Sequence, residues 1–155
     1  RHVHLALIGD LKGAGFFSNY NILYAKVKAS PLLASKVHFC GYVSDEDLVA
    51  LYSSAFAVTM PSYSEGFGLP AIEAMACGAP VLASDRGSLP EVIGDAGIYF
   101  DPFDIESISK AIIEMADNPR LRLQLSRNAR VKAKTFTWQN AAQATLTYLE
   151  AMIKK

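Results

Sequence analysis

The sequence predicts an α/β fold in which helices are wound onto both faces of a parallel sheet. Short continuous apolar runs, the pattern of buried parallel strands, recur along the chain. Segments with helical spacing of apolar residues separate these runs, and glycine or proline stands at most of the junctions. With 155 residues, the chain has room for one domain with a sizeable core.

Two strand-helix units are expected in the first third of the chain. Residues 3–8 form a mostly apolar strand that ends at a glycine, and residues 19–29 carry helical spacing that Ser30 and Pro31 end. Residues 36–43 predict a second strand with its exit loop. The polar run 44–47 resembles a capping box and starts a short helix.

A glycine-containing loop follows the next strand. The apolar run 55–60 predicts a buried strand, and Pro70 sits where a first helical turn tolerates proline. This helix is expected to end near Cys77, with Gly78 as its C-cap. Residues 61–69 therefore connect the carboxyl end of a strand to the start of a helix.

Further units complete the sheet. Residues 80–84 predict another buried strand, residues 88–91 a second capping box before a short helix, and residues 97–100 a last strand. Four or five such units, without internal repeats, predict a Rossmann-like doubly wound sheet in a three-layer αβα sandwich.

The C-terminal region predicts three packing helices. Asp104 caps the first and Asn118 begins the second, whose apolar positions include Val131. From Thr137 to the end, helical spacing continues, and Trp138 is expected in the core.

The loop at 61–73 has the chemistry of an anion site. In open α/β sheets, ligands bind outside the carboxyl ends of strands, and a helix N-terminus offers free N–H groups to an anion. Glu65 and Glu73 can each accept hydrogen bonds from hydroxyls beside that loop. This combination suits a sugar attached to a nucleoside diphosphate. The alternative is purely structural, with Glu73 a helix-start carboxylate and Gly66 and Gly68 serving a turn.

The same stretch resembles a known family. Glu65 and Glu73 enclose Gly-Phe-Gly-Leu-Pro and match the E-x7-E signature of retaining GT-B glycosyltransferases of family 4. Residues 61–62, 73–81, 88–92 and 100–102 also look like the nucleotide-sugar-binding half of those enzymes. Several matches at fixed spacings are far more specific than a glutamate pair alone.

The resemblance implies transfer of a sugar with retention of configuration and without an essential metal or other cofactor. It implies that Glu65 is the catalytic-site carboxylate that contacts and positions the donor sugar. The residues implied to hold the sugar and diphosphate through the loop amides are Gly66, Phe67, Gly68 and Leu69. Glu73 is implied to bind the ribose, and Tyr42 and Val43 to lie against the nucleobase.

The resemblance also implies that residues 1–155 are a single donor-binding domain from a longer enzyme. Its family has an N-terminal acceptor domain, and a basic pair on the first strand and helix of the donor domain, that have no counterpart in this sequence. We therefore expect the isolated chain to be inactive. The other function considered is a nucleotide-binding module or subunit without transfer chemistry.

The donor is expected to be GDP-mannose, with UDP-glucose and related donors open. The acceptor is expected to be a glycan or a lipid-linked molecule read by the missing domain. These expectations place the reaction in the cytoplasm or at the inner face of the membrane, and they allow peripheral membrane association of the full-length protein.

Composition and spacing argue against other classes. The 15 basic and 15 acidic residues give no net charge to attract nucleic acid. Cys40 and Cys77 stand alone in apolar settings and are expected to be buried thiols, and the three histidines have no partners at metal-ligand spacing. Gly9, Gly13 and Gly15 follow a strand but do not complete the glycine pattern of a dinucleotide site.

Overall fold

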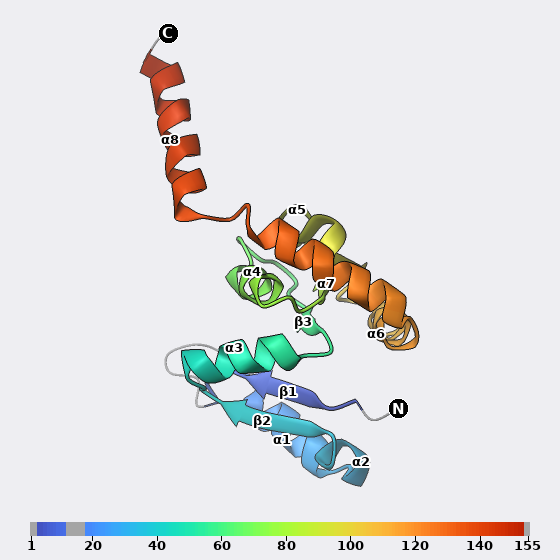
Figure 1. The fold of residues 1–155 in the computed structure, drawn as a ribbon. Helices are drawn as coiled ribbons and strands as arrows, with labels where there is room; N and C mark the ends of the chain where they lie inside the picture. The colour runs from blue at the N-terminus through green and yellow to red at the C-terminus, as the bar shows by residue number, and fades with distance from the viewer. Residues whose placement is uncertain (1–2, 12–17, 154–155) are drawn as a thin grey trace. The chain divides into compact units, whose positions relative to one another are not determined.

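The computed structural model describes residues 3–11 and 18–153 and contains two compact units, residues 1–48 and 49–155 (Figure 1). Gly13 and Gly15 of the incomplete dinucleotide pattern lie outside the described residues.

The first unit contains a two-stranded parallel sheet. Strand β1 (Leu5–Ile8) pairs with β2 (Val37–Gly41), with Leu5 opposite Val37. Helices α1 (Tyr20–Lys28) and α2 (Pro31–Ala34) connect the strands, and the rings of Tyr20 and Tyr24 meet Phe39 at centroid distances of 5.3 and 5.6 Å. The positions of β1, α1 and β2 agree with the sequence prediction, whereas α2 was not predicted: Ser30 caps a further helical turn that begins at Pro31.

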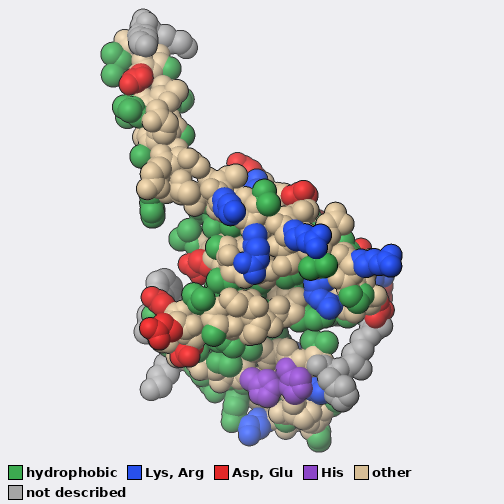
Figure 2. Space-filling model, viewed as in Figure 1, with side chains coloured by type: hydrophobic (Ala, Val, Ile, Leu, Met, Phe, Trp, Pro, Cys, Tyr) green, Lys and Arg blue, Asp and Glu red, His purple; other side chains and the backbone are tan. Residues whose placement is uncertain are grey.

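Two histidines of this unit lie side by side. His4 Nδ1 is 2.9 Å from His38 Nε2, and the two rings are stacked. Figure 2 shows them together on the surface. No sequence pattern indicated this contact, because pairing of β1 with β2 brings together residues 34 positions apart. Cys40 on β2 is exposed rather than buried.

Helix α3 (Asp45–Ser54) begins at the predicted capping box. The Asp47 N–H donates to Ser44 Oγ at 3.1 Å, and the Ser44 hydroxyl donates to the Asp47 carboxylate at 2.8 Å. The side chain of Ser44 thus satisfies one of the free amides of the first turn.

The second unit contains a three-stranded parallel sheet in the order β3-β4-β5. Its strands are β3 (Val58–Met60), β4 (Val81–Ser84) and β5 (Gly97–Phe100), with Val81 opposite both Val58 and Gly97. Because the strands are parallel, the loops that follow Met60, Ser84 and Phe100 leave the sheet at one edge.

A helix, or a helix with a 3₁₀ turn, lies between successive strands, and in the described part of the chain three further helices follow β5. These helical elements are α4 (Leu69–Ala76), α5 (Leu89–Ile93), η1 (Gly94–Ala96), α6 (Ile105–Asp117), α7 (Pro119–Ala133) and α8 (Trp138–Ile153). The predicted caps of α6 and α7 are confirmed: Asp104 accepts from the Glu106 N–H at 2.9 Å, and Asn118 from the Leu121 N–H at 3.0 Å.

The core of this unit lies on both faces of the sheet. Successive strand residues face opposite ways, so Val81 of β4 joins a first cluster and Leu82 a second. The first cluster includes Met75 of α4 and side chains of α5, whereas the second includes Phe100 of β5 and Met115 of α6. Helices thus cover both faces, as in the predicted three-layer sandwich.

Side chains of helix α7 cap the C-terminal ends of two other helices, α4 and α6. Arg130 Nη2 donates to the Cys77 carbonyl at 3.1 Å and Ser126 Oγ to the Gly78 carbonyl at 2.7 Å, just beyond α4. Arg122 Nη1 donates to the Met115 carbonyl of α6 at 3.4 Å. The basic side chains of α7 are among those that face the viewer in Figure 2, and their contacts satisfy carbonyls that a helix end leaves free.

Trp138, the side chain expected in the core, is exposed. Trp138 of α8 is 89% exposed, no described residue of α8 is buried, and Val131, one of the apolar positions of α7, is 69% exposed. Their helical spacing correctly predicted the helices. The expectation of burial was wrong because spacing does not identify what, if anything, packs against a face.

Because of Tyr99 in β5, the stability of this unit should fall at alkaline pH. Its hydroxyl donates to the Gly94 carbonyl at 2.6 Å, and burial, with a smaller effect of Asp95, raises the pKa of Tyr99 to about 12. Because the pKa of the folded state exceeds the ordinary value of 10, the stabilisation is present below pH 10 and is lost between pH 10 and 12.

We expect urea unfolding at pH 8 to 12 to show a progressive loss of stability from this group in the wild type, about 1 kcal/mol once solvent screening of the partly exposed hydroxyl is included. Tyr99→Phe, which has no hydroxyl to ionise, should lack this component. Identical pH profiles for both proteins would contradict the assignment.

Candidate functional site

The loop between β3 and α4 has the conformation that its glycines predict. Gly68 has φ +91° and ψ +44°, the left-handed region that favours glycine, and is the N-cap of α4. Pro70 lies in the first turn, as expected. The Ala71 and Ile72 N–H groups both donate to the Gly68 carbonyl, at 3.0 and 3.3 Å.

Four consecutive amides of this loop are unpaired. Among the described residues, no acceptor receives a hydrogen bond from the N–H groups of Gly66, Phe67, Gly68 or Leu69. The first amides of a helix carry the positive end of its dipole. The start of α4 therefore offers donors to an anion at the carboxyl edge of the sheet.

The backbone of Glu65 is hydrogen-bonded to the loop after β4. Its carbonyl accepts from Ser88 N–H at 3.2 Å and from Ser88 Oγ at 3.1 Å. Gly87 has φ +61°, and a Cβ there would lie only 2.7 Å from the Glu65 carbonyl oxygen. The second capping box was therefore a wrong prediction: the Ser88 side chain makes no capping bond to α5 and supports Glu65 instead.

Side-chain packing also fixes the loop. A Cβ at Gly68 would lie 2.9 Å from Leu89 Cδ2 and 3.6 Å from Glu65 Cγ, so this position has no room for a side chain. The Phe67 ring meets Phe136 edge to face at 6.0 Å. These contacts stabilise one arrangement of the loop that carries Glu65 and the free amides.

Glu73 lies in α4, exposed, next to Tyr52 of α3. Burial raises the pKa of Tyr52, and the charges of the Glu73 carboxylate and of Cys77 raise it further. The Glu73 carboxylate is exposed and can therefore accept hydrogen bonds from a ligand.

The residues predicted to contact a base lie after β2. Tyr42 is 88% exposed and Val43 is partly buried. They belong to the first unit, whereas the stretch from Glu65 to Glu73 belongs to the second.

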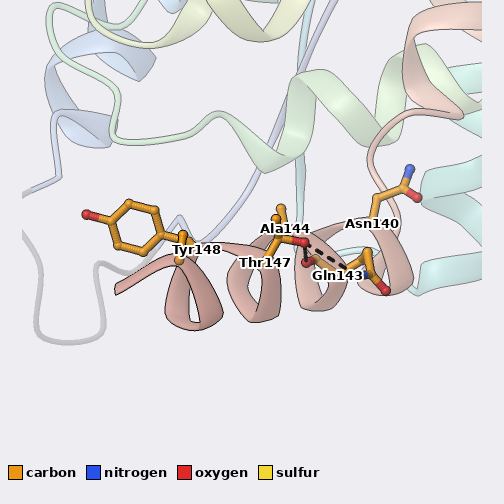
Figure 3. Close-up of a pocket in the computed structure, with 6 residues that line it drawn as sticks. Asn140, Gln143, Ala144, Thr147 and Tyr148 are labelled. Atoms are coloured by element: carbon orange, nitrogen blue, oxygen red, sulfur yellow. Dashed lines mark hydrogen bonds between the residues drawn. The ribbon is translucent and has the colours of Figure 1, made fainter. Parts of the chain in front are cut away.

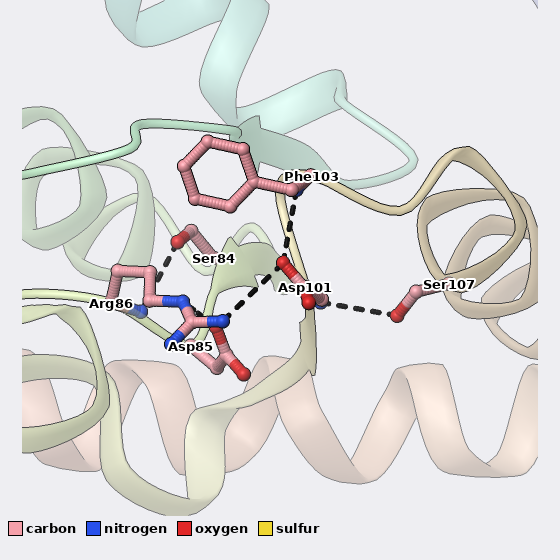
Figure 4. Close-up of polar contacts among 6 residues, drawn as sticks. All are labelled: Ser84, Asp85, Arg86, Asp101, Phe103 and Ser107. Atoms are coloured by element: carbon pink, nitrogen blue, oxygen red, sulfur yellow. Dashed lines mark hydrogen bonds and ion pairs between the residues drawn. The ribbon is translucent and has the colours of Figure 1, made fainter.

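Arg86 is paired with carboxylates. Its Nε lies 2.9 Å from Asp85 Oδ1 and its Nη2 lies 3.5 Å from Asp101 Oδ1. Figure 4 shows this network after β4 and β5. The Arg86–Asp101 pair was not foreseen, because the two residues come from different strand exits and no sequence pattern connects them. Two carboxylates beside the guanidinium argue against Arg86 as a diphosphate ligand.

Helix α8 borders an open hollow. The hollow has a volume of about 610 Å³ and is lined by Asn140, Gln143, Ala144, Thr147, Tyr148 and Ala151. Figure 3 shows that all the labelled residues come from that helix, with Gln143 Nε2 bonded to Thr147 Oγ1 at 3.5 Å. A surface made by one helix offers no converging polar groups and is not a candidate site.

Within residues 3–11 and 18–153, no cluster of three or more His, Cys, Asp or Glu side chains is arranged to hold a metal ion. None of the helices in that part of the chain has the length and apolar character needed to cross a bilayer.

The chain is similar to known glycosyltransferases. Residues 20–132 match the model of the family described as glycosyl transferases group 1. The chain is 44% identical over 110 residues to the O-antigen chain mannosyltransferase B of Escherichia coli, covering 71% of the chain and 29% of that protein. It is 40% identical over 123 residues to the MMP α-(1→4)-mannosyltransferase of Mycolicibacterium hassiacum, covering 77% and 30%.

Solved structures agree. Sucrose-phosphate synthase from Thermosynechococcus elongatus superimposes with a TM-score of 0.83 at 30% identity, covering 98% of this chain and 39% of that one. The Anabaena protein HepE in complex with UDP-glucose has a TM-score of 0.80 at 24% identity, covering 96% and 41%, and supports the fold alone. The predicted Rossmann-like α/β fold is confirmed.

The chain spans roughly a third or less of the length of these mannosyltransferases. The family model nevertheless covers most of the chain, including all of the loop that carries Glu65 and Glu73. By this match and by its fold, the chain belongs to the glycosyl transferases group 1 family.

Proposed function

We propose that this chain is the donor-binding domain of a retaining glycosyltransferase. It binds a nucleoside-diphosphate hexose, with mannose favoured, for transfer to a glycan or lipid-linked acceptor. Family membership supports the transferase class, and the similarity to two mannosyltransferases supports mannose.

One observation carries the proposal. The four amides from Gly66 to Leu69, unpaired among the described residues, stand at the start of α4, and in the sequence they lie between Glu65 and Glu73. Amides at a helix start bind phosphate oxygens, and carboxylates accept from sugar hydroxyls. A sugar nucleotide presents both kinds of group in one molecule.

In this proposal Glu65 holds the donor sugar, the loop amides hold the sugar and diphosphate, and Glu73 holds the ribose. As the glycosidic bond breaks, negative charge builds on the departing diphosphate. The amides are already oriented by the Gly68 turn, so they stabilise this charge without reorganising. Glu65 positions the sugar rather than forming a covalent bond with it, and no essential metal is invoked.

The base and the acceptor extend the proposal. Tyr42 and Val43 would contact the nucleobase, with GDP-mannose as the favoured donor. UDP-glucose is the second donor to test, because the sequence leaves this donor open. The acceptor would be read largely by a second domain, so the isolated chain should bind donors without transferring sugar.

Calorimetric titration of the chain with GDP, UDP, GDP-mannose and UDP-glucose tests the function. We expect one nucleotide family to bind, and Glu73→Ala to weaken it by at least about tenfold through loss of a carboxylate that accepts ribose hydroxyls. Glu91→Ala, which removes an exposed carboxylate from the first turn of α5, is the matched control and should bind like the wild type.

Equal affinities for wild type and Glu73→Ala would place the ribose elsewhere. If no nucleotide binds, the titration is repeated with the longest natural protein that contains this chain. Failure there as well would overturn the proposed function.

A further inference from the structure

A pair of stacked aromatic side chains lies at the same sheet edge as Glu65. Tyr63 follows β3 and Phe103 follows β5, and their ring centroids are 4.6 Å apart with only 8° between the planes. Tyr63 is 65% exposed and Phe103 is 69% exposed. Each ring covers one face of the other, so the pair forms an open ledge of two parallel rings, which we call the aromatic ledge.

The ledge is bordered by fixed polar groups. The Phe103 N–H donates to Asp101 Oδ1 at 3.0 Å, and the Asp101 N–H donates to Ser107 Oγ at 3.1 Å. The same Asp101 oxygen lies 3.5 Å from Arg86 Nη2. Figure 4 shows these contacts converging on Asp101. The backbone that carries Phe103 is therefore held in place.

The aromatic ledge is connected to Glu65 in two ways, through the loop after β4 and through the chain segment from Tyr63 to Glu65. Arg86 pairs with Asp101 and precedes Gly87 and Ser88, which hold the Glu65 backbone. Tyr63, stacked on Phe103, lies two residues before Glu65 in the chain. The ledge thus has a fixed relation to the carboxylate proposed to position the donor sugar.

This surface has the chemistry of a carbohydrate subsite. A pyranose ring has an apolar C–H face and an edge of hydroxyls. The C–H face can pack on the outer face of an aromatic ring of the ledge. The hydroxyls can form hydrogen bonds with the Asp101 carboxylate, the Arg86 guanidinium and the Tyr63 hydroxyl. The negative and positive groups are largely paired, so a neutral ligand fits this border better than a charged one.

We propose that the aromatic ledge binds a sugar ring of the acceptor glycan, beside the donor site. The inference rests on the proposed function, which assigns the donor sugar to Glu65 and the loop amides. A second sugar held at the same edge is then an acceptor residue. This domain would accordingly contribute to acceptor recognition as well as donor binding.

The test uses α-linked mannotriose as the probe, titrated into the ¹⁵N-labelled chain. We expect amide shifts at residues 63 and 101–103. Tyr63→Ala and Phe103→Ala should each weaken the fitted affinity about threefold to tenfold, the range of aromatic stacking energies. Tyr63→Phe keeps the ring and should retain most of the affinity.

Tyr148→Ala is the matched control, because Tyr148 is 68% exposed and lies on α8. It should bind mannotriose like the wild type. Since the ledge side chains are exposed, their alanine variants should melt at the wild-type temperature, and Phe103→Tyr provides a second variant that keeps the stack. Shifts that spread over exposed aromatics generally, or affinities unchanged by both ledge variants, would overturn the inference.

Nucleotide titration of the same variants separates the two proposals. If the chain binds a nucleotide but mannotriose leaves residues 63 and 101–103 unmoved, the ledge inference fails and the donor site stands. If mannotriose binds at the ledge but no nucleotide binds to this chain or to the longest natural protein that contains it, the donor proposal fails, and the ledge remains a carbohydrate site without the acceptor role.

Discussion

Gly87→Ala is expected to lower the free energy of unfolding by about 3 kcal/mol, because it combines backbone strain with a steric clash. Its φ of +61° already disfavours any residue with a Cβ. The added carbon would also lie 2.7 Å from the oxygen and 2.9 Å from the nitrogen of Glu65. Those are backbone atoms, so they cannot move aside as a flexible side chain would, and Glu65 itself must shift.

Urea unfolding and the amide shifts of residues 65–68 measure both effects. Gly94→Ala is a control for φ, since Gly94 has φ +60° but its nearest neighbours, carbon and nitrogen of the Lys132 side chain, are 3.8 Å away. It should lose stability without moving the 65–68 amides. Gly66→Ala, with nothing near its Cβ position, controls for an added methyl group in the loop. Unmoved Glu65 and Gly66 amides in Gly87→Ala would contradict the predicted clash.

Phe100→Ala is expected to cost about 3 to 5 kcal/mol through lost burial and an unfilled cavity. Phe100 ends β5, is 2% exposed, and packs in the second core cluster with Leu82 and Met115. Its carbonyl also accepts from the Asp85 N–H at 3.0 Å, so the strand end that it stabilises supports the Arg86 network.

The same truncation three residues later provides the comparison. Phe103 is 69% exposed, and Phe103→Ala should change the unfolding free energy by no more than about 0.5 kcal/mol, as is usual for surface positions. Similar losses for the two variants in urea unfolding would show that the second cluster is not the core of this unit.

Local signals in the sequence predicted most of the fold. Ser44, Asp104 and Asn118 cap the expected helices, and Gly78 follows α4 with φ +85° as a C-cap glycine does. These interactions act within a few residues, so their spacing is visible in the chain. The strand-loop-helix arrangement around Gly68 was predictable for the same reason.

Interactions between distant segments were not predictable. Ser88 has the spacing of a capping residue, yet its hydroxyl bonds Glu65, 23 positions away. Tyr63 and Phe103 carry no joint sequence signal, because only the parallel order of β3, β4 and β5 brings their loops to one edge. His4 and His38 meet through strand pairing in the same way. A local sequence pattern does not show whether a side chain contacts a nearby residue or a distant residue that offers the same chemical group.

Helix α7 has a consequence for how the second unit unfolds. It supplies Leu125 to the cluster on one face of the sheet, and Ala129 and Ala133 to the cluster on the other. Detaching this helix would therefore expose both faces at once and free the carbonyls beyond α4. Both core clusters should therefore lose their packing in the same step. We expect the unit to unfold cooperatively, without a populated intermediate in which one face of the sheet stays packed.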